Sequence, residues 1–147
     1  MTTQTDIQLA SELRTVVTRL IKKLRKKSAT GMMLSLTERS TMSLLDQHGE
    51  LLPNELASME KITNQSMSQI LNHLFELGYI NRRISKEDKR KSIISLSAKG
   101  TAVLKQVRSE RDSWLYEAIN QTCSAEEMKI LKKAIEPLKR LVEFEGV

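Results

Sequence analysis

The chain has 147 residues, of which 39% are hydrophobic and 3% aromatic, so we expect one domain with a core of aliphatic side chains and methionine. Its formal net charge of +6 favours an anionic partner, a property that ribosomal and membrane-surface proteins share. One cysteine excludes an intrachain disulfide and argues against a dedicated zinc or iron site, and no apolar run approaches the ~20 residues of a membrane span.

The N-terminal segment has no basic-then-apolar signal pattern, which predicts a cytoplasmic protein. From about residue 6 to 27, apolar residues recur at helical spacing over about six turns, and five basic residues end the helix. Cations suit the negative end of a helix, so a solvated terminus is a simpler explanation for them than contact with DNA phosphates. A small domain cannot bury the whole apolar stripe, and we expect part of it to contact another chain.

The next segment, residues 28–35, is expected to form a loop. Thr37 is then the expected N-cap of a helix that carries apolar residues and ends at Gly49. The low content of Pro and Gly, with long periodic runs between them, indicates a mostly helical protein.

A further helix is expected to open at Pro53, whose ring suits the first helical turn. Leu52 lacks the side-chain oxygen that normally caps a helix, a departure with a cost of ~1 kcal/mol. Lys61 occupies the turn that follows, where glycine is common because the backbone is often left-handed. We therefore expect mild strain at Lys61.

Thr63 is the expected N-cap of a helix that continues to Leu77 and stops at Gly78. Its apolar residues recur at the spacing of one helical face, at Met67, Ile70, Leu71, Leu74 and Leu77. The opposite face is polar but uncharged, with Asn64, Gln65, Ser68, Gln69, Asn72 and His73. Short amide and hydroxyl groups suit base edges in a major groove, although an ordinary amphipathic helix explains this segment equally well by itself.

Two β-prone runs, Tyr79–Ile84 and Ser92–Leu96, flank a charged turn and predict a β-hairpin. Between Lys61 and Gly100 there are eight basic and three acidic residues, a net charge of +5 concentrated at this hairpin. A basic hairpin beside two short helices is how a winged helix grips the DNA backbone.

Two long helices are expected to complete the chain. Ser97 caps the first of them, and the S-x-x-E pattern from Ser124 to Glu127 caps the second. Pro137 lies inside the last helix and is expected to kink it. Cys123 precedes the last cap, and we expect a small buried residue there rather than a redox sensor.

Three segments resemble the signature of the MarR family of winged-helix transcription regulators: Leu77-Gly78-Tyr79-Ile80-x-Arg82, Asp88-x-Arg90 and Leu96-Ser97-x-x-Gly100. Leu56-Ala57 and, more loosely, the terminal helices extend the resemblance to nearly the whole chain. It implies a mainly α fold in a single domain of residues 1–147. A winged helix-turn-helix with a two-stranded β wing would occupy about residues 37–97, between dimerisation helices at about 5–30 and 98–145.

The resemblance implies a homodimeric, sequence-specific, double-stranded DNA-binding regulator, with a repressor more common than an activator. Two-fold symmetry would place two recognition helices ~34 Å apart on an inverted-repeat operator. The resemblance also implies a ligand pocket between the dimerisation helices and the DNA-binding region, where small anions lower DNA affinity. The sequence identifies no effector, and no cofactor or membrane partner is expected.

The candidate DNA contacts lie in two places. On the expected recognition helix they are Thr63, Asn64, Gln65, Ser68, Gln69 and His73. In the wing they are Arg82, Asp88, Lys89, Arg90 and Lys91. Arg90 resembles the family residue that enters the minor groove, and Asp88 is expected to orient Arg82 or Arg90 through an ion pair. Lys89 and Lys91 would contact phosphates, and a merely solvated turn is the alternative.

An enzyme is not expected, because no G-x-G-x-x-G, P-loop, H-E-x-x-H or G-x-S-x-G motif occurs. The main alternative is a winged helix that serves only protein–protein contact. That alternative predicts an exposed apolar patch on the recognition helix, whereas the face in the sequence is rich in amides and the wing is basic.

Overall fold

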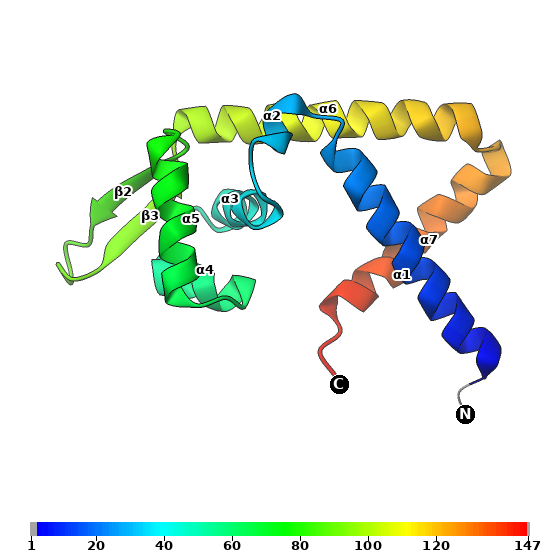
Figure 1. Ribbon diagram of the computed structural model, residues 1–147, viewed down its shortest axis with the longest axis horizontal. Helices are drawn as coiled ribbons and strands as arrows, with labels where there is room; N and C mark the ends of the chain where they lie inside the picture. The colour runs from blue at the N-terminus through cyan, green and yellow to red at the C-terminus, as the bar shows by residue number, and fades with distance from the viewer. Residues whose placement is uncertain (1–2, 147) are drawn as a thin grey trace. The chain divides into compact units, whose positions relative to one another are not determined.

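The computed structural model describes residues 3–146 and confirms the mainly α fold (Figure 1). The chain forms two compact units, the first ending at Arg111 and the second beginning at Asp112. The helices and strands are α1 (Gln4–Arg25), α2 (Ala29–Met32), α3 (Leu36–His48), β1 (Glu50–Leu51), α4 (Pro53–Glu60), α5 (Asn64–Glu76), β2 (Ile80–Ile84), β3 (Ser92–Leu96), α6 (Ala98–Thr122) and α7 (Ala125–Glu143).

The first helix, α1, begins with a capping box. The Thr3 hydroxyl accepts a hydrogen bond from the backbone N–H of Asp6 at 3.1 Å, and the Asp6 carboxylate accepts one from the Thr3 N–H at 3.1 Å. None of the 22 residues of α1 is buried within this chain. The apolar stripe predicted from the sequence therefore forms, and the chain itself does not cover it.

The segment before α3 differs from the prediction. The expected loop at residues 28–35 contains the single helical turn α2, because the buried Ser28 hydroxyl accepts a hydrogen bond from the Gly31 N–H at 3.0 Å. The N-cap of α3 is Ser35 and not Thr37. Glu38 stands three residues after Ser35, and its carboxylate accepts the Ser35 N–H at 2.8 Å, so a capping box decides where the helix begins.

The two helices α4 and α5 are joined as predicted. Pro53 is in the first turn of α4, and Leu52 caps it without a side-chain oxygen. Lys61 has φ 57° and ψ 43°, the left-handed backbone expected from its place in the turn. Thr63 caps α5, where its hydroxyl accepts a hydrogen bond from the Ser66 N–H at 3.0 Å.

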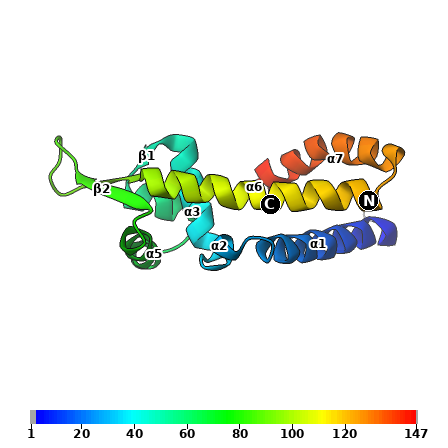
Figure 2. The same cartoon turned by 90° about the horizontal axis from the view of Figure 1, so that it is seen from above.

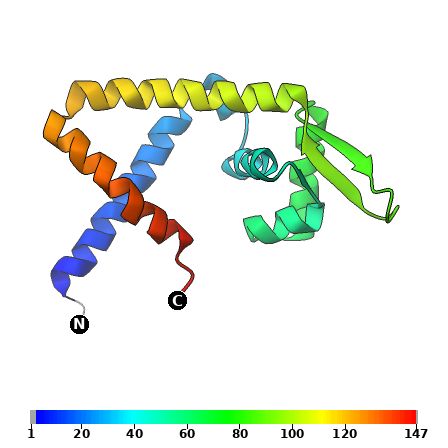
Figure 3. The same cartoon turned by 180° about the vertical axis from the view of Figure 1, so that it is seen from behind.

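The core of the first unit lies between α3, α4, α5 and the sheet. From α5, Met67, Leu71 and Leu74 are buried, as the helical spacing predicts. They pack in one cluster with the buried side chains Leu34, Met42, Leu45, Leu51, Leu56, Ala57, Ile80, Ile94 and Leu104. Seen from above and from behind, the hairpin of β2 and β3 projects away from these helices (Figures 2 and 3).

The sheet has three antiparallel strands in the order β1-β3-β2, one more than predicted. In the hairpin, Arg82 lies opposite Ile94, and on the other edge of β3 the short β1 pairs Glu50 with Ser95. A strand of two residues has no periodicity of its own, so only its pairing with β3 reveals it. We call β2, β3 and the turn between them the wing.

The start of α6 is fastened to the start of β2. The Ser97 hydroxyl donates to the Gly78 carbonyl at 2.6 Å and accepts from the Gly100 N–H at 2.9 Å. The Ser97 N–H donates to the Tyr79 carbonyl at 3.0 Å. Gly78 has φ +80°, and a Cβ at Gly100 would lie 2.0 Å from the Tyr79 carbonyl oxygen. Only glycine at position 100 allows this close approach.

In the second unit, the end of α6 packs with α7. The predicted capping box is present, since the Ser124 hydroxyl accepts the Glu127 N–H at 3.1 Å. The helix α7 contains Pro137 and has no buried residue within this chain. Cys123 is half-buried. In the part of the chain that the structure describes, no helix is long and apolar enough to cross a membrane.

We expect Gly100→Ala to destabilise the fold by about 3 kcal/mol, because the added methyl group would force apart α6 and the Tyr79 backbone. Urea unfolding followed by circular dichroism measures this loss. Lys105→Ala, at an exposed position of the same helix, is the control and should change stability by less than about 0.5 kcal/mol. Equal stability of the two variants would contradict the tight fastening.

Candidate nucleic-acid interface

The polar face of α5 is exposed as predicted. Its six polar residues Asn64, Gln65, Ser68, Gln69, Asn72 and His73 are all exposed, while the opposite face is buried in the core. The helical period places Gln65, Gln69 and Asn72 on one central stripe, opposite the buried Met67 and Leu74. This surface therefore offers amide donors and acceptors on a well-anchored helix. Contact of these residues with DNA stays a prediction.

Thr63 has a structural task at the start of α5. Besides accepting the Ser66 N–H, its hydroxyl donates to the Ser66 hydroxyl at 3.0 Å. Both its proton and one lone pair are thus used within the helix start. The first free N–H groups of α5 lie beside it, and a helix N-terminus attracts anions such as phosphate.

His73 lies at the edge of the polar face and turns toward α3. Its Nδ1 contacts the carboxylate of Glu38, whose side chain is only 10% exposed. Burial raises the pKa of Glu38, but hydrogen bonds from the Ser35 backbone and from His73 outweigh this effect, so its pKa is lowered. His73 was predicted as a DNA contact, and the structure uses one of its nitrogens to tie α5 to α3.

We expect the stability that Glu38 contributes to depend on pH. Because its folded-state pKa is lowered, the carboxylate stabilises the fold above its ordinary pKa of 4.5, and this contribution is lost as the pH falls through the folded-state value. Glu38→Gln should therefore be less stable than the wild type at neutral pH, and the difference should shrink in acid. Urea unfolding across this range measures the difference.

The exposed Glu117 offers a matched control for this pH dependence. Glu117→Gln makes the same chemical change without removing a buried carboxylate. Its unfolding free energy should stay parallel to that of the wild type at every pH. A Glu38→Gln difference that does not narrow in acid would contradict the role assigned to the carboxylate.

The turn of the wing holds Arg90 through Asp88. The Asp88 carboxylate accepts hydrogen bonds from Arg90 Nε at 3.1 Å, Arg90 Nη2 at 3.2 Å and the Arg90 backbone N–H at 3.0 Å. These bonds from Arg90 lower the pKa of Asp88. Asp88 was expected on a strand, but it lies in the turn, where an aspartate readily bonds a backbone N–H two residues ahead.

Ser85 stabilises the same turn and was not anticipated from the sequence. It is buried, and its hydroxyl accepts hydrogen bonds from the backbone N–H groups of Glu87 and Asp88, each at 3.3 Å. Its own N–H donates to the Lys91 carbonyl at 2.9 Å. The Arg90 side chain, which is 90% exposed, is thus presented on an ordered turn. Lys89 and Lys91 are exposed beside it.

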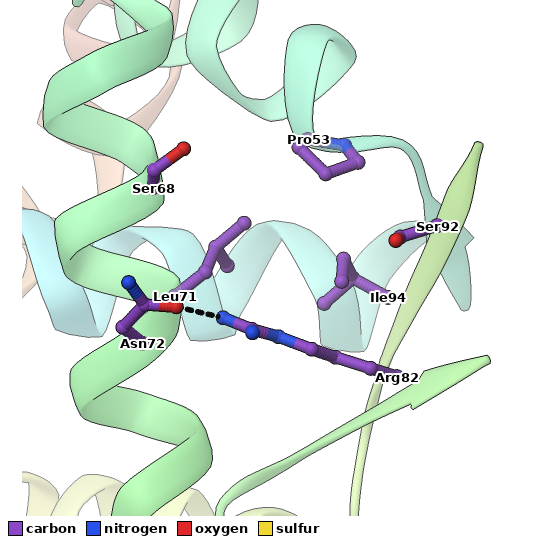
Figure 4. A pocket seen from close by; sticks show the side chains of 7 residues that line it. All are labelled: Pro53, Ser68, Leu71, Asn72, Arg82, Ser92 and Ile94. Atoms are coloured by element: carbon purple, nitrogen blue, oxygen red, sulfur yellow. Dashed lines mark hydrogen bonds between the residues drawn. The ribbon is translucent and has the colours of Figure 1, made fainter. Parts of the chain in front are cut away.

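Arg82 does not pair with Asp88 and instead approaches α5. Its Nη2 donates to Asn72 Oδ1 at 2.7 Å, and its Cζ lies 5.0 Å from the centre of the Phe75 ring. Figure 4 shows this pair beside a hollow of about 170 Å³ between α5, Pro53 and the strands. The neighbouring Arg83 pairs with Glu50 at 2.9 Å.

Asn72 and Phe75 were therefore missed as members of the site. The signal for Asn72 was present, because it shares the polar face with the predicted contacts. Phe75 gave no signal, since an aromatic residue at that spacing is ordinarily part of a core. Among the described residues, no group of three or more His, Cys, Asp or Glu side chains is arranged to bind a metal ion.

A model of the MarR family matches residues 34–92 of the chain. The HTH-type transcriptional regulator MT0903.1 of Mycobacterium tuberculosis is 30% identical over 138 residues, which cover 94% of this chain and 95% of that protein. The crystal structure of a transcriptional regulator from Pseudomonas aeruginosa has a TM-score of 0.86 and 28% identity, covering 98% of this chain and all of that one.

The fold also matches that of a DNA complex. A point mutant of Staphylococcus aureus MepR, bound to an oligodeoxyribonucleotide, has a TM-score of 0.68 and 19% identity, and the match covers 91% of this chain and 97% of that one. At this identity the likeness concerns the fold alone.

Proposed function

Because the chain belongs to the MarR family of transcriptional regulators, we propose that it binds an inverted-repeat operator in double-stranded DNA as a homodimeric repressor. Membership of this family makes it a winged-helix regulator and not an enzyme. The observation that carries the proposal is the juxtaposition of an exposed amide face on α5 with a basic, internally braced wing turn. As an operator-binding protein, it would act in the cytoplasm, where the chromosome lies.

In this proposal α5 enters the major groove. Asn64, Gln65, Ser68 and Gln69 would meet base edges or neighbouring phosphates, with the N-terminus of α5 toward the backbone. The helix can hold its position because its apolar face is anchored in the core and His73 ties it to α3. The side chains then vary little in position when DNA arrives, which favours specific contacts.

The wing turn would follow the backbone into the adjacent minor groove. Arg90 would insert there, where a narrow A·T tract has a strongly negative potential. Asp88 holds the guanidinium by two of its N–H groups, and three others remain for DNA. Lys89 and Lys91 flank the turn and would contact phosphates.

We expect Arg90→Ala to weaken binding to the DNA upstream of the protein's own gene and to flatten the slope of log K against log salt by about 0.9, one phosphate equivalent. Fluorescence anisotropy at several salt concentrations, with competitor DNA, measures both quantities. The control Lys105→Ala removes the same charge from α6 and should leave the slope unchanged. An unchanged slope for Arg90→Ala would remove this residue from the mechanism.

The homodimer is proposed from the uncovered apolar side chains of both terminal helices. On α1, Ile7 and Val16 are 58% and 61% exposed, and on α7, Ile135 and Leu141 are 49% and 60% exposed. Such long stripes are typical of helices that pack against another chain. A two-fold dimer would present two copies of α5 about 34 Å apart, so the operator would have inverted half-sites.

We expect the wild type to sediment at twice its chain mass of 16.8 kDa at micromolar concentration. Ile135→Asp should weaken the dimer by on the order of tenfold or more, because a carboxylate would be buried in an apolar interface. Lys133→Asp places the same side chain at another exposed position of α7 and should remain dimeric. A wild type that sediments as a clean monomer would defeat the dimer proposal.

Release by a small anionic effector is a further part of the proposal. Arg111 supports it, because its Nε and Nη2 atoms are buried without a hydrogen-bond partner among the described residues. Burial, and then the nearby Arg25, lower the pKa of Arg111. The guanidinium lies against Gly31, where a carboxylate would neutralise two adjacent cations.

The alternative of a winged helix used only for protein–protein contact is less well supported. It requires an apolar exposed patch on α5, and the exposed face carries amides and hydroxyls. Phe75 is half exposed near the end of that face, but the Arg82 guanidinium lies over its ring.

A further inference from the structure

Asn72 occupies the centre of the exposed stripe of α5 and has a neighbour that no other residue of this stripe has. Arg82 reaches it from β2, at 2.7 Å between Nη2 and Oδ1. The same guanidinium lies over Phe75, one helical turn further along α5. Two contacts from one helix thus hold Arg82 in place, and Arg82 in turn holds the Asn72 amide.

The chemistry of this contact decides which way the amide faces. A guanidinium has only donors, so the carbonyl oxygen of Asn72 and not its nitrogen must face Arg82. Figure 4 shows the amide nitrogen pointing away from Arg82. Asn72 therefore presents an N–H donor to its surroundings, while its oxygen is engaged by a charged partner.

An asparagine normally recognises adenine with both atoms. Its oxygen accepts from adenine N6 while its nitrogen donates to adenine N7. With its oxygen held by Arg82, Asn72 lacks the free acceptor that adenine N6 and cytosine N4 require. Guanine and thymine offer acceptor atoms in the major groove, at O6 and N7 or at O4, and these match an N–H donor.

We propose that Arg82 is a positioning residue that makes Asn72 a hydrogen-bond donor only, so that this position of the operator is guanine or thymine and not adenine. The inference rests on the proposed DNA binding. It assigns to Arg82 a role beyond phosphate contact, and it adds Asn72 to the residues that determine sequence preference.

Arg83 provides a matched comparison on the same strand. It follows Arg82 directly, so its side chain leaves the opposite face of the strand, and it pairs with Glu50 at 2.9 Å. Replacing either arginine by methionine removes one positive charge and keeps a long side chain. Only the replacement at position 82 frees the Asn72 oxygen.

The test is selection of binding sites from a randomised pool of duplex DNA by the wild-type protein and by Arg82→Met, Asn72→Ala, Arg83→Met and the double variant Arg82→Met/Asn72→Ala. The wild type should select guanine or thymine at one position of each half-site. Arg82→Met and Asn72→Ala should both lower the preference over adenine at that same position, by about tenfold, the size of one base-edge contact.

The double variant should relax this position no further than either single variant, because both changes remove one unit. Arg83→Met should weaken binding to all sequences alike and leave the consensus intact. Thermal unfolding of each variant checks the fold. If Arg82→Met does not fold, Asn72→Ala still identifies the position and the base selected there.

Two results would overturn the inference. One is adenine in the wild-type consensus at the position that Asn72→Ala relaxes, since adenine needs the oxygen to be free. The other is an unchanged consensus with Arg82→Met and a uniform loss of affinity, the behaviour of a phosphate contact. A wild type that selects no sequence at all would refute the proposed function itself, and the inference with it.

Discussion

The arrangement of the candidate interface depends on the hydrogen bonds that join the start of α6 to the start of β2. Ser97 bonds both Gly78 and Gly100, and Gly100 lets the Tyr79 carbonyl come within a distance that no side chain would permit. The helix α5 ends at Glu76, just before this junction, and β2 begins just after it. The angle between the helix and the wing is therefore set at one point, and both proposed DNA-binding elements leave from it.

Two arginines of the wing are held in place by different partners, which gives them different capacities. Asp88 accepts two side-chain bonds from Arg90 at the exposed tip, whereas the neutral Asn72 accepts one from Arg82 beside α5. In both cases the guanidinium is ordered before any ligand arrives, so less conformational entropy remains to be lost on binding. Arg82 keeps its full charge beside a neutral amide, while the charge of Arg90 is partly offset.

Local signals predicted most of the fold. Ser97, Ser124, Pro53 and Thr63 mark helix starts in the sequence, and each prediction is confirmed. The predicted N-cap of α3 was wrong, although the S-x-x-E pattern beginning at Ser35 was available. By contrast, β1 and the bond between Asn72 and Arg82 depend on how the wing folds back on its neighbours. Sequence periodicity does not contain that information, because residues ten positions apart meet only through the hairpin angle.

Lys61 illustrates how the joint between α4 and α5 is made stiff. It is the one non-glycine residue of the described chain with a positive φ, a conformation that costs roughly 1 kcal/mol relative to glycine. A glycine there would relieve that strain, but it would also enlarge the set of conformations open to the unfolded chain. The lysine narrows the choice of backbone shapes at the joint. A partner that docks on α5 would then meet a pair of helices whose mutual angle need not be frozen at the moment of contact.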